Sequence, residues 1–262
     1  MSSEALSRLE LLLGGGAVAR LAQSAFLVCG LGGVGSWAAE ALGRSGVGAL
    51  ALADFDTVKE SNLNRQLVAL RSTVGRLKAE VMAERLLDIQ PRLEVEVVTE
   101  RLTPENVITL LERRPHWDGV LDAIDERSAK LALLEACVKR GIPVVSSMGA
   151  ANKISPEQIT VADLSKTSGC PFAKLIRKEM RRRGITHGIT CVYSPELPVE
   201  SPGDAEAAET LREAPGAKRP LGSMVTVTAI FGMRCAQTLL ENVTGSRGLP
   251  HRGGWRRRER PL

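Results

Sequence analysis

One short glycine-rich stretch constrains this chain more than any other feature. Residues 25–30 form an apolar run that fits a buried strand, and they continue directly into Gly30-Leu31-Gly32-Gly33-Val34-Gly35. This is the spacing G-x-G-x-x-G at a strand-to-helix junction, where glycines permit a tight turn and let backbone amides approach phosphate oxygens. The stretch predicts a nucleotide-binding α/β fold. Taken alone, it fits NAD, FAD or ATP equally well, and a glycine turn without a ligand is the bland alternative.

The first 150 residues alternate between strand-like and helix-like patterns. Such alternation is typical of a Rossmann-like, doubly wound, mostly parallel sheet. Strands are predicted at 25–30, 49–54, 93–98, 119–123 and 142–146, and helices at 34–44, 73–90, 127–139 and from the Thr103-Pro104-Glu105 turn onward.

After residue 150 the pattern changes, and further strands at 158–162 and 188–193 are expected to extend the sheet. A basic helix is predicted at 173–183 and a last helix at 224–240. Residues 195–222 lack periodicity and predict a mobile loop, whereas the Gly- and Arg-rich residues 245–262 predict a basic, disordered tail. No clean linker is visible, so residues 1–262 are expected to form a single domain.

Polar side chains downstream of the glycines favour a nucleoside triphosphate. Asp54 ends the second predicted strand, 24 residues after Gly30, where an acid can bind ribose hydroxyls. Arg65 offers a planar fork and Lys78 a point charge for phosphate oxygens, and Asn62 can orient a ligand by hydrogen bonding, as can Gln66. A hydride-transfer site needs no such set of cations, whereas three phosphoryl groups do. Each of these side chains could instead be an ordinary surface residue.

Two carboxylates follow the strand predicted at 119–123. Asp122 and Asp125 lie at its carboxyl end, the edge at which open parallel sheets bind ligands. Oxygen ligands suit Mg²⁺, so Asp125 is the candidate metal ligand and Asp122 is assigned a structural role. The alternative for Asp125 is a cap on the helix that follows from Arg127.

The positive charge of the chain is concentrated in two places. The net charge is +5, yet residues 174–183 and residues 244–262 each contribute +5, which leaves the remainder acidic. Two basic clusters on an acidic protein suggest a polyanion such as a nucleic acid, and a solvated helix face plus a tail is the alternative. Aromatic residues make up only 3%, which argues against an array of base-stacking platforms.

The cysteines indicate a reducing, cytoplasmic location. There are five of them, they are never spaced C-x-x-C, and so they support neither a disulfide scaffold nor a four-cysteine zinc site. Cys29 and Cys137 lie in apolar runs that predict core positions. Cys191 is the best candidate for a reactive thiol, although a strand cysteine is more often packed. The apolar runs are too short for a signal peptide or a membrane span.

Several ordered motifs together resemble a known family. They read GLGGVG, DFDTVKESNLNRQ, VGRLKAE and LDAIDER, and they resemble the ubiquitin-activating-enzyme-like adenylyltransferases of the ThiF/MoeB type. Within that group the chain is most similar to the bacterial tRNA threonylcarbamoyladenosine dehydratases, through RLELLLG, GGVGSWAAEALGRSGVG, NRQLVALRSTVGRLKAEVMAERL and DLSKT. The resemblance covers most of residues 6–195 and the helix after Leu221.

The resemblance implies an ATP- and Mg²⁺-dependent enzyme that assembles as a homodimer. Arg8 resembles the arginine that reaches the ATP site of a partner subunit. The ATP phosphates would be bound by Gly30, Gly32, Gly33 and Gly35 of the loop and held by Asn62, Arg65 and Lys78. The ribose would be bound by Asp54, and the Mg²⁺ would be coordinated by Asp125.

The implied reaction activates the threonyl carboxylate of threonylcarbamoyladenosine in tRNA as an acyl-adenylate, after which internal attack closes a ring with net loss of water. The tethered nucleophile has a high effective molarity, so no enzyme nucleophile is needed. The basic helix would then contact tRNA phosphates through Lys174, Arg177, Lys178 and Arg181.

The main alternative within the family is an adenylyltransferase that activates a ubiquitin-like sulfur-carrier protein, and a sulfur-transfer protein is a further candidate partner. Outside the family, an NAD- or FAD-dependent oxidoreductase and a non-catalytic nucleotide-binding scaffold are the competing hypotheses. The polar, arginine-rich end departs from the apolar end of membrane-associated relatives, so no stable membrane anchor is expected.

Overall fold

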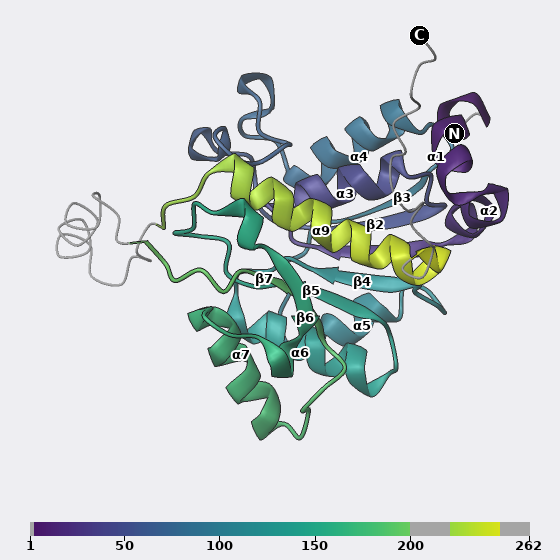
Figure 1. The fold of residues 1–262 in the computed structure, drawn as a ribbon. Coiled ribbons are helices and arrows are strands. Elements are labelled where there is room, and N and C mark those ends of the chain that lie inside the picture. Colours follow the sequence, from purple (N-terminus) through teal and green to yellow (C-terminus); the bar gives the residue numbers. More distant parts are fainter. Residues whose placement is uncertain (1–2, 200–220, 247–262) are drawn as a thin grey trace, which may run out of the picture.

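A computed structural model describes residues 3–199 and 221–246 of the chain (Figure 1). Most of the predicted loop at 195–222 and most of the predicted tail at 245–262 lie outside these residues. The prediction of a mobile loop and a disordered tail therefore stays untested, and residues 195–199 are irregular as expected.

A twisted sheet forms the centre of the molecule, and its strands come in the order β3-β2-β1-β4-β5-β7-β6 within the described residues. All neighbours pair in parallel except β6 and β7, which are antiparallel. The predicted doubly wound, mostly parallel sheet with extra strands after residue 150 is thus confirmed. The strands are β1 (Ala25–Cys29), β2 (Ala49–Ala53), β3 (Glu94–Val98), β4 (Gly119–Asp122), β5 (Val144–Ser147), β6 (Thr160–Asp163) and β7 (Thr190–Tyr193).

The strand order reverses at β1, which pairs with β2 on one side and β4 on the other. Chain connections leave in opposite directions at such a switch point, so a crevice opens at the carboxyl ends of the two central strands. The glycine-rich loop follows β1 directly, which places it at this crevice.

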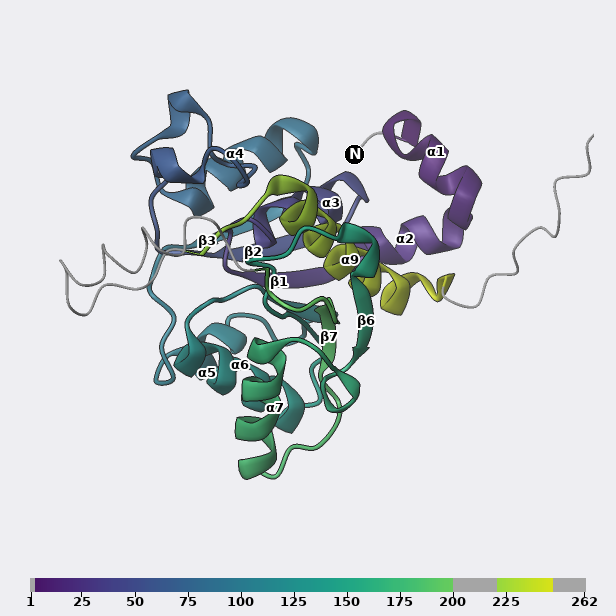
Figure 2. The same cartoon turned by 60° about the vertical axis from the view of Figure 1, so that its left-hand side comes forward.

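Helices cover both faces of the sheet (Figure 2). Alternate residues of β1 enter two separate apolar cores: Phe26 and Val28 face one, and Leu27 and Cys29 face the other. Helices α3 (Gly35–Arg44), α4 (Lys78–Ile89) and α9 (Val225–Thr244) cover the first face, and α5 (Val107–Leu111), α6 (Arg127–Lys139) and α7 (Pro171–Arg182) cover the second.

Two amino-terminal helices were not predicted from the sequence. Helix α1 spans Ser3–Leu13 and α2 spans Gly15–Gln23, and Gly14 joins them with a φ of 82°. Leu11 and Leu12 are exposed at 79% and 73%, whereas Leu6, Leu9 and Leu13 are half-buried at helical spacing. The helical periodicity of α1 is therefore present, but it spans only the few residues before Gly14.

The helix predicted at 73–90 begins five residues later than expected, at Lys78. Residues 74–77 instead pair with the segment after β2: the amide of Val58 donates to the carbonyl of Arg76 at 2.8 Å, and the amide of Gly75 donates to the carbonyl of Val58 at 2.9 Å. Gly75 has a φ of 90°, which favours glycine and prevents a continuous helix. Lys78 consequently lies in the first turn of α4.

The predicted helix start at Thr103-Pro104-Glu105 is also displaced. Residues 104–106 form a turn, and α5 begins at Val107. The side chain of Asn106 accepts a hydrogen bond from the amide of Thr103 at 2.9 Å, which closes this turn before the helix starts. Asn favours such local bonds over helix interiors.

The remaining predicted elements agree with the structure to within a few residues, including the last helix, which extends to Thr244 and ends at Gly245 in the left-handed conformation. No helix in residues 3–199 or 221–246 is long and apolar enough to cross a membrane.

Candidate functional site

A cavity of about 670 Å³ opens at the switch point of the sheet. Its size is typical of a pocket for a ligand as large as a nucleotide. The structure brings most of the predicted site residues together in its wall: Gly30, Gly32, Gly33, Asp54, Asn62, Arg65, Gln66, Lys78 and Asp125.

The glycines of the loop are needed for different reasons. Gly30 has a φ of 88°, and a Cβ there would lie 2.7 Å from the carbonyl oxygen of Ala123. A Cβ on Gly35 would overlap the carbonyl oxygen of Gly30, and one on Gly33 would crowd α9. Gly32 is different, because a Cβ there would meet only the side-chain amide of Gln66, at 3.8 Å. Three glycines thus allow the turn to pack closely against neighbouring atoms, whereas Gly32 faces the cavity.

The loop leads directly into α3, so the amino-terminal end of this helix lies next to the glycine loop that lines the cavity. The peptide dipoles of the helix place partial positive charge there, which favours an anion such as a phosphate. Gly35 is the first residue of this helix and does not line the cavity itself.

Asp54 lies at the carboxyl end of β2 and is 9% exposed. Its carboxylate accepts hydrogen bonds from the amides of Leu31 at 2.6 Å and Asp56 at 2.8 Å. Burial raises the pKa of Asp54 above its ordinary value, although the Lys78 charge and the two amides oppose this shift. The two amides fix the carboxylate at the rim of the glycine loop, where its remaining lone pairs can accept from ligand hydroxyls.

Lys78 reaches the cavity from the first turn of α4. Its side chain is almost fully buried, and its Nζ lies 2.9 Å from a carboxylate oxygen of Asp56. Asp56 also lines the cavity and was not predicted as a site residue. Because the amide of Lys78 donates to the carbonyl of Asp56 at 3.0 Å, the two residues are tied together at both backbone and side chain.

The segment that includes the 3-10 helix Glu60–Asn62 forms another wall. The side chain of Asn62 accepts from the amide of Lys59 at 3.0 Å and so holds the segment together. The Nη1 of Arg65 donates to the carbonyl of Ser61 and the side chain of Asn64, both at 2.9 Å. Among the described residues, these two contacts engage only one of the guanidinium nitrogens of Arg65, which leaves a planar, charged group for an anion. The side-chain oxygen of Gln66 is buried without a hydrogen-bond partner there.

Asp125 lines the cavity with an exposed side chain. The alternative that Asp125 caps α6 is wrong, because Glu126 is the cap and accepts from the amides of Ser128 at 3.0 Å and Ala129 at 2.8 Å. Within the described part of the chain, no group of three or more acidic, histidine or cysteine side chains could hold a metal by itself. A carboxylate beside a phosphate pocket fits Mg²⁺, which is commonly held by one or two carboxylates and phosphate oxygens.

Residues after β3 complete the wall and were missed by the sequence analysis. Glu100, Arg101 and Leu102 line the cavity, and the guanidinium of Arg101 lies 5.0 Å from the ring centroid of Phe55. Strand β3 lies at the edge beside β2, so its carboxyl end reaches the same crevice. Only the strand order places these residues at the cavity, and the sequence pattern did not specify the strand order.

The cysteines lie in the core instead of the site. No cysteine lines the cavity, and all five are buried. Burial raises the pKa of the Cys191 thiol well above its ordinary value, and raises that of Cys137 to about 12. Buried thiols of this kind are poor nucleophiles because the thiolate is disfavoured.

The basic side chains of α7 separate into two kinds. Lys174, Lys178 and Arg181 are exposed and follow one another at helical spacing along one face. Arg177 turns inward and donates to the carbonyl of Thr167 at 2.7 Å. The structure therefore groups three of the four proposed tRNA contacts and gives Arg177 a role in holding the loop before α7.

Arg8 is exposed on α1 and does not line the cavity of its own chain. Helix α2 is tied to the far end of α9, because Arg20 donates to the carbonyls of Val243 at 3.0 Å and Thr244 at 2.7 Å. The cavity touches α9 at Thr228, and Thr244 lies sixteen residues further along this helix, or about 24 Å away. Figure 2 shows α1 beyond α2, at the outside of the molecule.

Comparison with known proteins agrees with this geometry. The model of the ThiF family matches residues 6–254. A tRNA threonylcarbamoyladenosine dehydratase of Bacillus subtilis is 41% identical over 229 residues, which cover 87% of this chain and 89% of that protein.

The solved structures give the same result. The crystal structure of the Escherichia coli tRNA N6-threonylcarbamoyladenosine dehydratase in complex with ATP matches with a TM-score of 0.81 and 37% identity, covering 94% of this chain and 96% of that one. The complex of that enzyme with AMP matches with a TM-score of 0.83 and 36% identity over the same shares of the two chains.

Proposed function

Because this chain belongs to the ThiF family, we infer that its cavity binds ATP and uses it to dehydrate threonylcarbamoyladenosine in tRNA to the cyclic form. The chain is an ATP-dependent tRNA-modifying enzyme. The observation that carries this function is the 41% identity to a dehydratase over most of both chains, together with the convergence of the matching residues on one nucleotide-sized cavity. This function is favoured over the two hypotheses that the glycine motif left open, an oxidoreductase and a non-catalytic nucleotide-binding scaffold.

The chemistry follows from the weakness of a carboxylate as an electrophile. Its oxygen attacks the α-phosphorus of ATP, pyrophosphate leaves, and an acyl-adenylate forms. A nucleophile within the same modified nucleoside then attacks the activated carbonyl carbon and expels AMP, which closes the ring with net removal of one water. Since the nucleophile is tethered, proximity supplies much of the rate, and the lack of a cysteine in the cavity wall presents no difficulty.

The side chains of the cavity have matching tasks in the first step. We propose that Arg65 and Lys78 hold the phosphates and neutralise charge that develops on the departing pyrophosphate, and that Asp54 orients the ribose. Mg²⁺ fits a position at Asp125 and the phosphate oxygens, where it would neutralise phosphate charge. Asn62 keeps the segment that carries Arg65 in place.

The function is tested by incubating the protein with ATP, Mg²⁺ and tRNA that carries threonylcarbamoyladenosine. We expect mass spectrometry of the digested tRNA to show loss of the mass of one water from that nucleoside, with one AMP and one pyrophosphate formed per product. The control omits ATP and should leave the nucleoside unchanged. An unaltered nucleoside in the complete reaction would reject the function.

We propose that α7 contacts the tRNA backbone through Lys174, Lys178 and Arg181, which have no ion pair within the described residues. Replacing all three by serine should weaken tRNA binding and lower the slope of log K against log salt by about 2–3, because fewer counterions are released. Arg182 and Arg183 are paired with acidic side chains, so replacing these two by serine is the control and should change the slope less. Equal slopes in filter-binding assays of the wild type and the triple variant would exclude this surface. A tRNA substrate agrees with the cytoplasmic location expected from the sequence.

We further propose that the enzyme is a homodimer in which Arg8 reaches the cavity of the partner subunit. The support is the exposed position of Arg8, its absence from the wall of the cavity of its own chain, and the exposed Leu11 and Leu12 of the same helix. An arginine that enters an active site in trans stabilises charge in phosphoryl chemistry.

Mixing two inactive variants distinguishes this arrangement from one in which Arg8 acts within its own chain. We expect Arg8→Ala and Lys78→Met each to have little turnover alone. After subunit exchange, a mixed dimer holds one cavity with both residues intact, so an equal mixture should recover about one quarter of the wild-type turnover for a two-fold symmetric assembly. Absence of recovery, despite exchange shown by native mass spectrometry of tagged chains, would rule out the arrangement in trans.

A further inference from the structure

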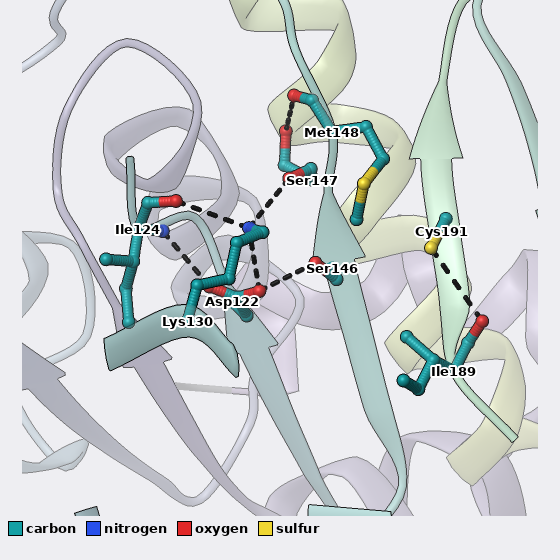
Figure 3. A network of polar contacts seen from close by, with 8 residues as sticks. All are labelled: Asp122, Ile124, Lys130, Ser146, Ser147, Met148, Ile189 and Cys191. Atoms are coloured by element: carbon teal, nitrogen blue, oxygen red, sulfur yellow. Dashed lines mark hydrogen bonds and ion pairs between the residues drawn. The ribbon is translucent and has the colours of Figure 1, made fainter. Parts of the chain in front are cut away.

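Behind the cavity lies a buried ion pair that the proposed chemistry does not use (Figure 3). Lys130 extends from α6 into the interior, and its side chain and that of Asp122 are both 0% exposed. Its Nζ lies 2.7 Å from Asp122 and donates to the carbonyls of Ser147 at 2.9 Å and Ile124 at 3.3 Å. Three acceptors match the three donors of an ammonium group.

Asp122 is equally well engaged at the carboxyl end of β4. One of its oxygens accepts from the hydroxyl of Ser146 at 2.6 Å, and the other accepts from the amide of Ile124 at 3.1 Å. The network therefore joins the ends of β4 and β5 to α6. Phe172, at the start of α7, closes it from outside, with its ring centroid 5.6 Å from Nζ of Lys130.

The network holds both polar backbone groups of Ile124, the residue immediately before Asp125. The carbonyl of Ile124 lies in the same peptide plane as the amide of Asp125, so fixing that oxygen orients the backbone from which the Asp125 side chain projects. On the other side, Glu126 is fixed as the cap of α6. Asp125 is thus an exposed side chain on an immobilised backbone.

The same loop touches the phosphate loop. The peptide that joins Ala123 to Ile124 packs so closely on Gly30 that a Cβ there would lie 2.7 Å from the Ala123 oxygen and 3.3 Å from the Ile124 amide. Any shift of residues 123–126 would therefore move Asp125 and disturb the turn at Gly30.

Burying two charges removes their hydration, and apolar side chains of similar volume often give equal or greater stability. We propose that Lys130, paired with Asp122, is a positioning residue: it fixes residues 123–126 so that the Asp125 carboxylate faces the Mg²⁺-bearing phosphates of ATP. This inference rests on the proposed function only because both assume that the ligand is Mg·ATP. Its test uses no tRNA.

The test is the double variant Lys130→Met with Asp122→Asn, which removes both charges and leaves no uncompensated buried ion. We expect it to fold, as judged by circular dichroism. The affinity for ATP is measured by isothermal titration calorimetry, once in Mg²⁺ and once in EDTA. The ratio of the two affinities is the Mg²⁺-dependent gain in ATP affinity of each protein. We expect the variant to lose about 10- to 100-fold of that gain, the usual effect of removing groups that orient a metal ligand.

Two further variants make the result decisive. Ser146→Ala removes one hydrogen bond to Asp122 without changing charge, so it should fold and lose a smaller part of the gain. If the double variant does not fold, the loss measured for Ser146→Ala tests the inference instead. Arg85→Met with Glu40→Gln removes an ion pair between α3 and α4 whose shortest contact is 2.8 Å and which does not line the cavity. This control should lower the melting temperature and leave the gain unchanged.

The inference is overturned if the folded variant keeps the full Mg²⁺-dependent gain, whatever its melting temperature, because the pair then serves stability alone. A wild-type protein that binds ATP equally well in Mg²⁺ and EDTA would overturn it too. Failure of the proposed function is a separate result, since it would appear as unchanged tRNA in the presence of intact Mg·ATP binding.

Discussion

Replacing Lys78 by methionine should reduce turnover of ATP with modified tRNA by roughly 100- to 1,000-fold, the cost typical of losing one preorganised group that stabilises transition-state charge. The expected loss is large because two effects add. The variant removes a positive charge from the phosphate pocket, and it leaves the carboxylate of Asp56 unpaired beside the phosphates. Methionine keeps the length and apolar contacts of the buried stem, so α4 should remain folded.

Pyrophosphate release measures this loss, and thermal unfolding followed by circular dichroism shows whether the fold is kept. Asp56→Asn is the matched control, because it breaks the same ion pair while keeping the cation. It should retain far more turnover than Lys78→Met. Equal losses in the two variants would show that the pair matters and the Lys78 charge does not.

Removal of the Asp125 carboxylate by Asp125→Ala should strongly reduce Mg·ATP-dependent turnover while the melting temperature stays close to that of the wild type. The side chain is exposed and Glu126 supplies the helix cap, so little folding energy depends on Asp125. Exposed positions of this kind change stability by about 0.5 kcal/mol or less. The loss of turnover should again be roughly 100- to 1,000-fold, because the carboxylate acts on charge in the transition state.

A titration of turnover against Mg²⁺ concentration identifies the cause. If Asp125 holds the metal, Asp125→Asn should need more Mg²⁺ for half-maximal turnover than the wild type. Arg127→Ala, an exposed neighbour outside the cavity wall, should behave as the wild type. Undiminished turnover in Asp125→Ala would remove the metal role from this residue.

Several site residues could be located from the sequence because their positions follow from local rules. The glycine spacing and the apolar runs place Gly30, Asp54 and Asp125 at or just beyond the carboxyl ends of three strands, and parallel strands bring those ends to one edge. Local rules were insufficient for Lys78. Its place in the first turn of α4 depends on the pairing of residues 74–77 with the segment after β2, and the helical pattern before it was misleading.

The direction in which a side chain points could not be predicted from the sequence. Arg177 and Lys178 are neighbours in a basic run, yet Arg177 turns inward to Thr167 while Lys178 faces solvent. Lys130 gave no sign of burial, because lysine is seldom buried without a partner and its partner lies on a different element.

The amino-acid sequence by itself determined the parallel sheet and the nucleotide loop, since these depend on periodicity and on residue spacing along one strand-turn-helix unit. Its ordered motifs indicated the family and the type of chemistry through their resemblance to known proteins. The tertiary structure alone decided which side chains meet: Lys78 with Asp56, Lys130 with Asp122, and Arg101 with the ring of Phe55. The physical reason is that such contacts join segments whose separation is set by strand order and helix packing, and a one-dimensional pattern carries no record of either.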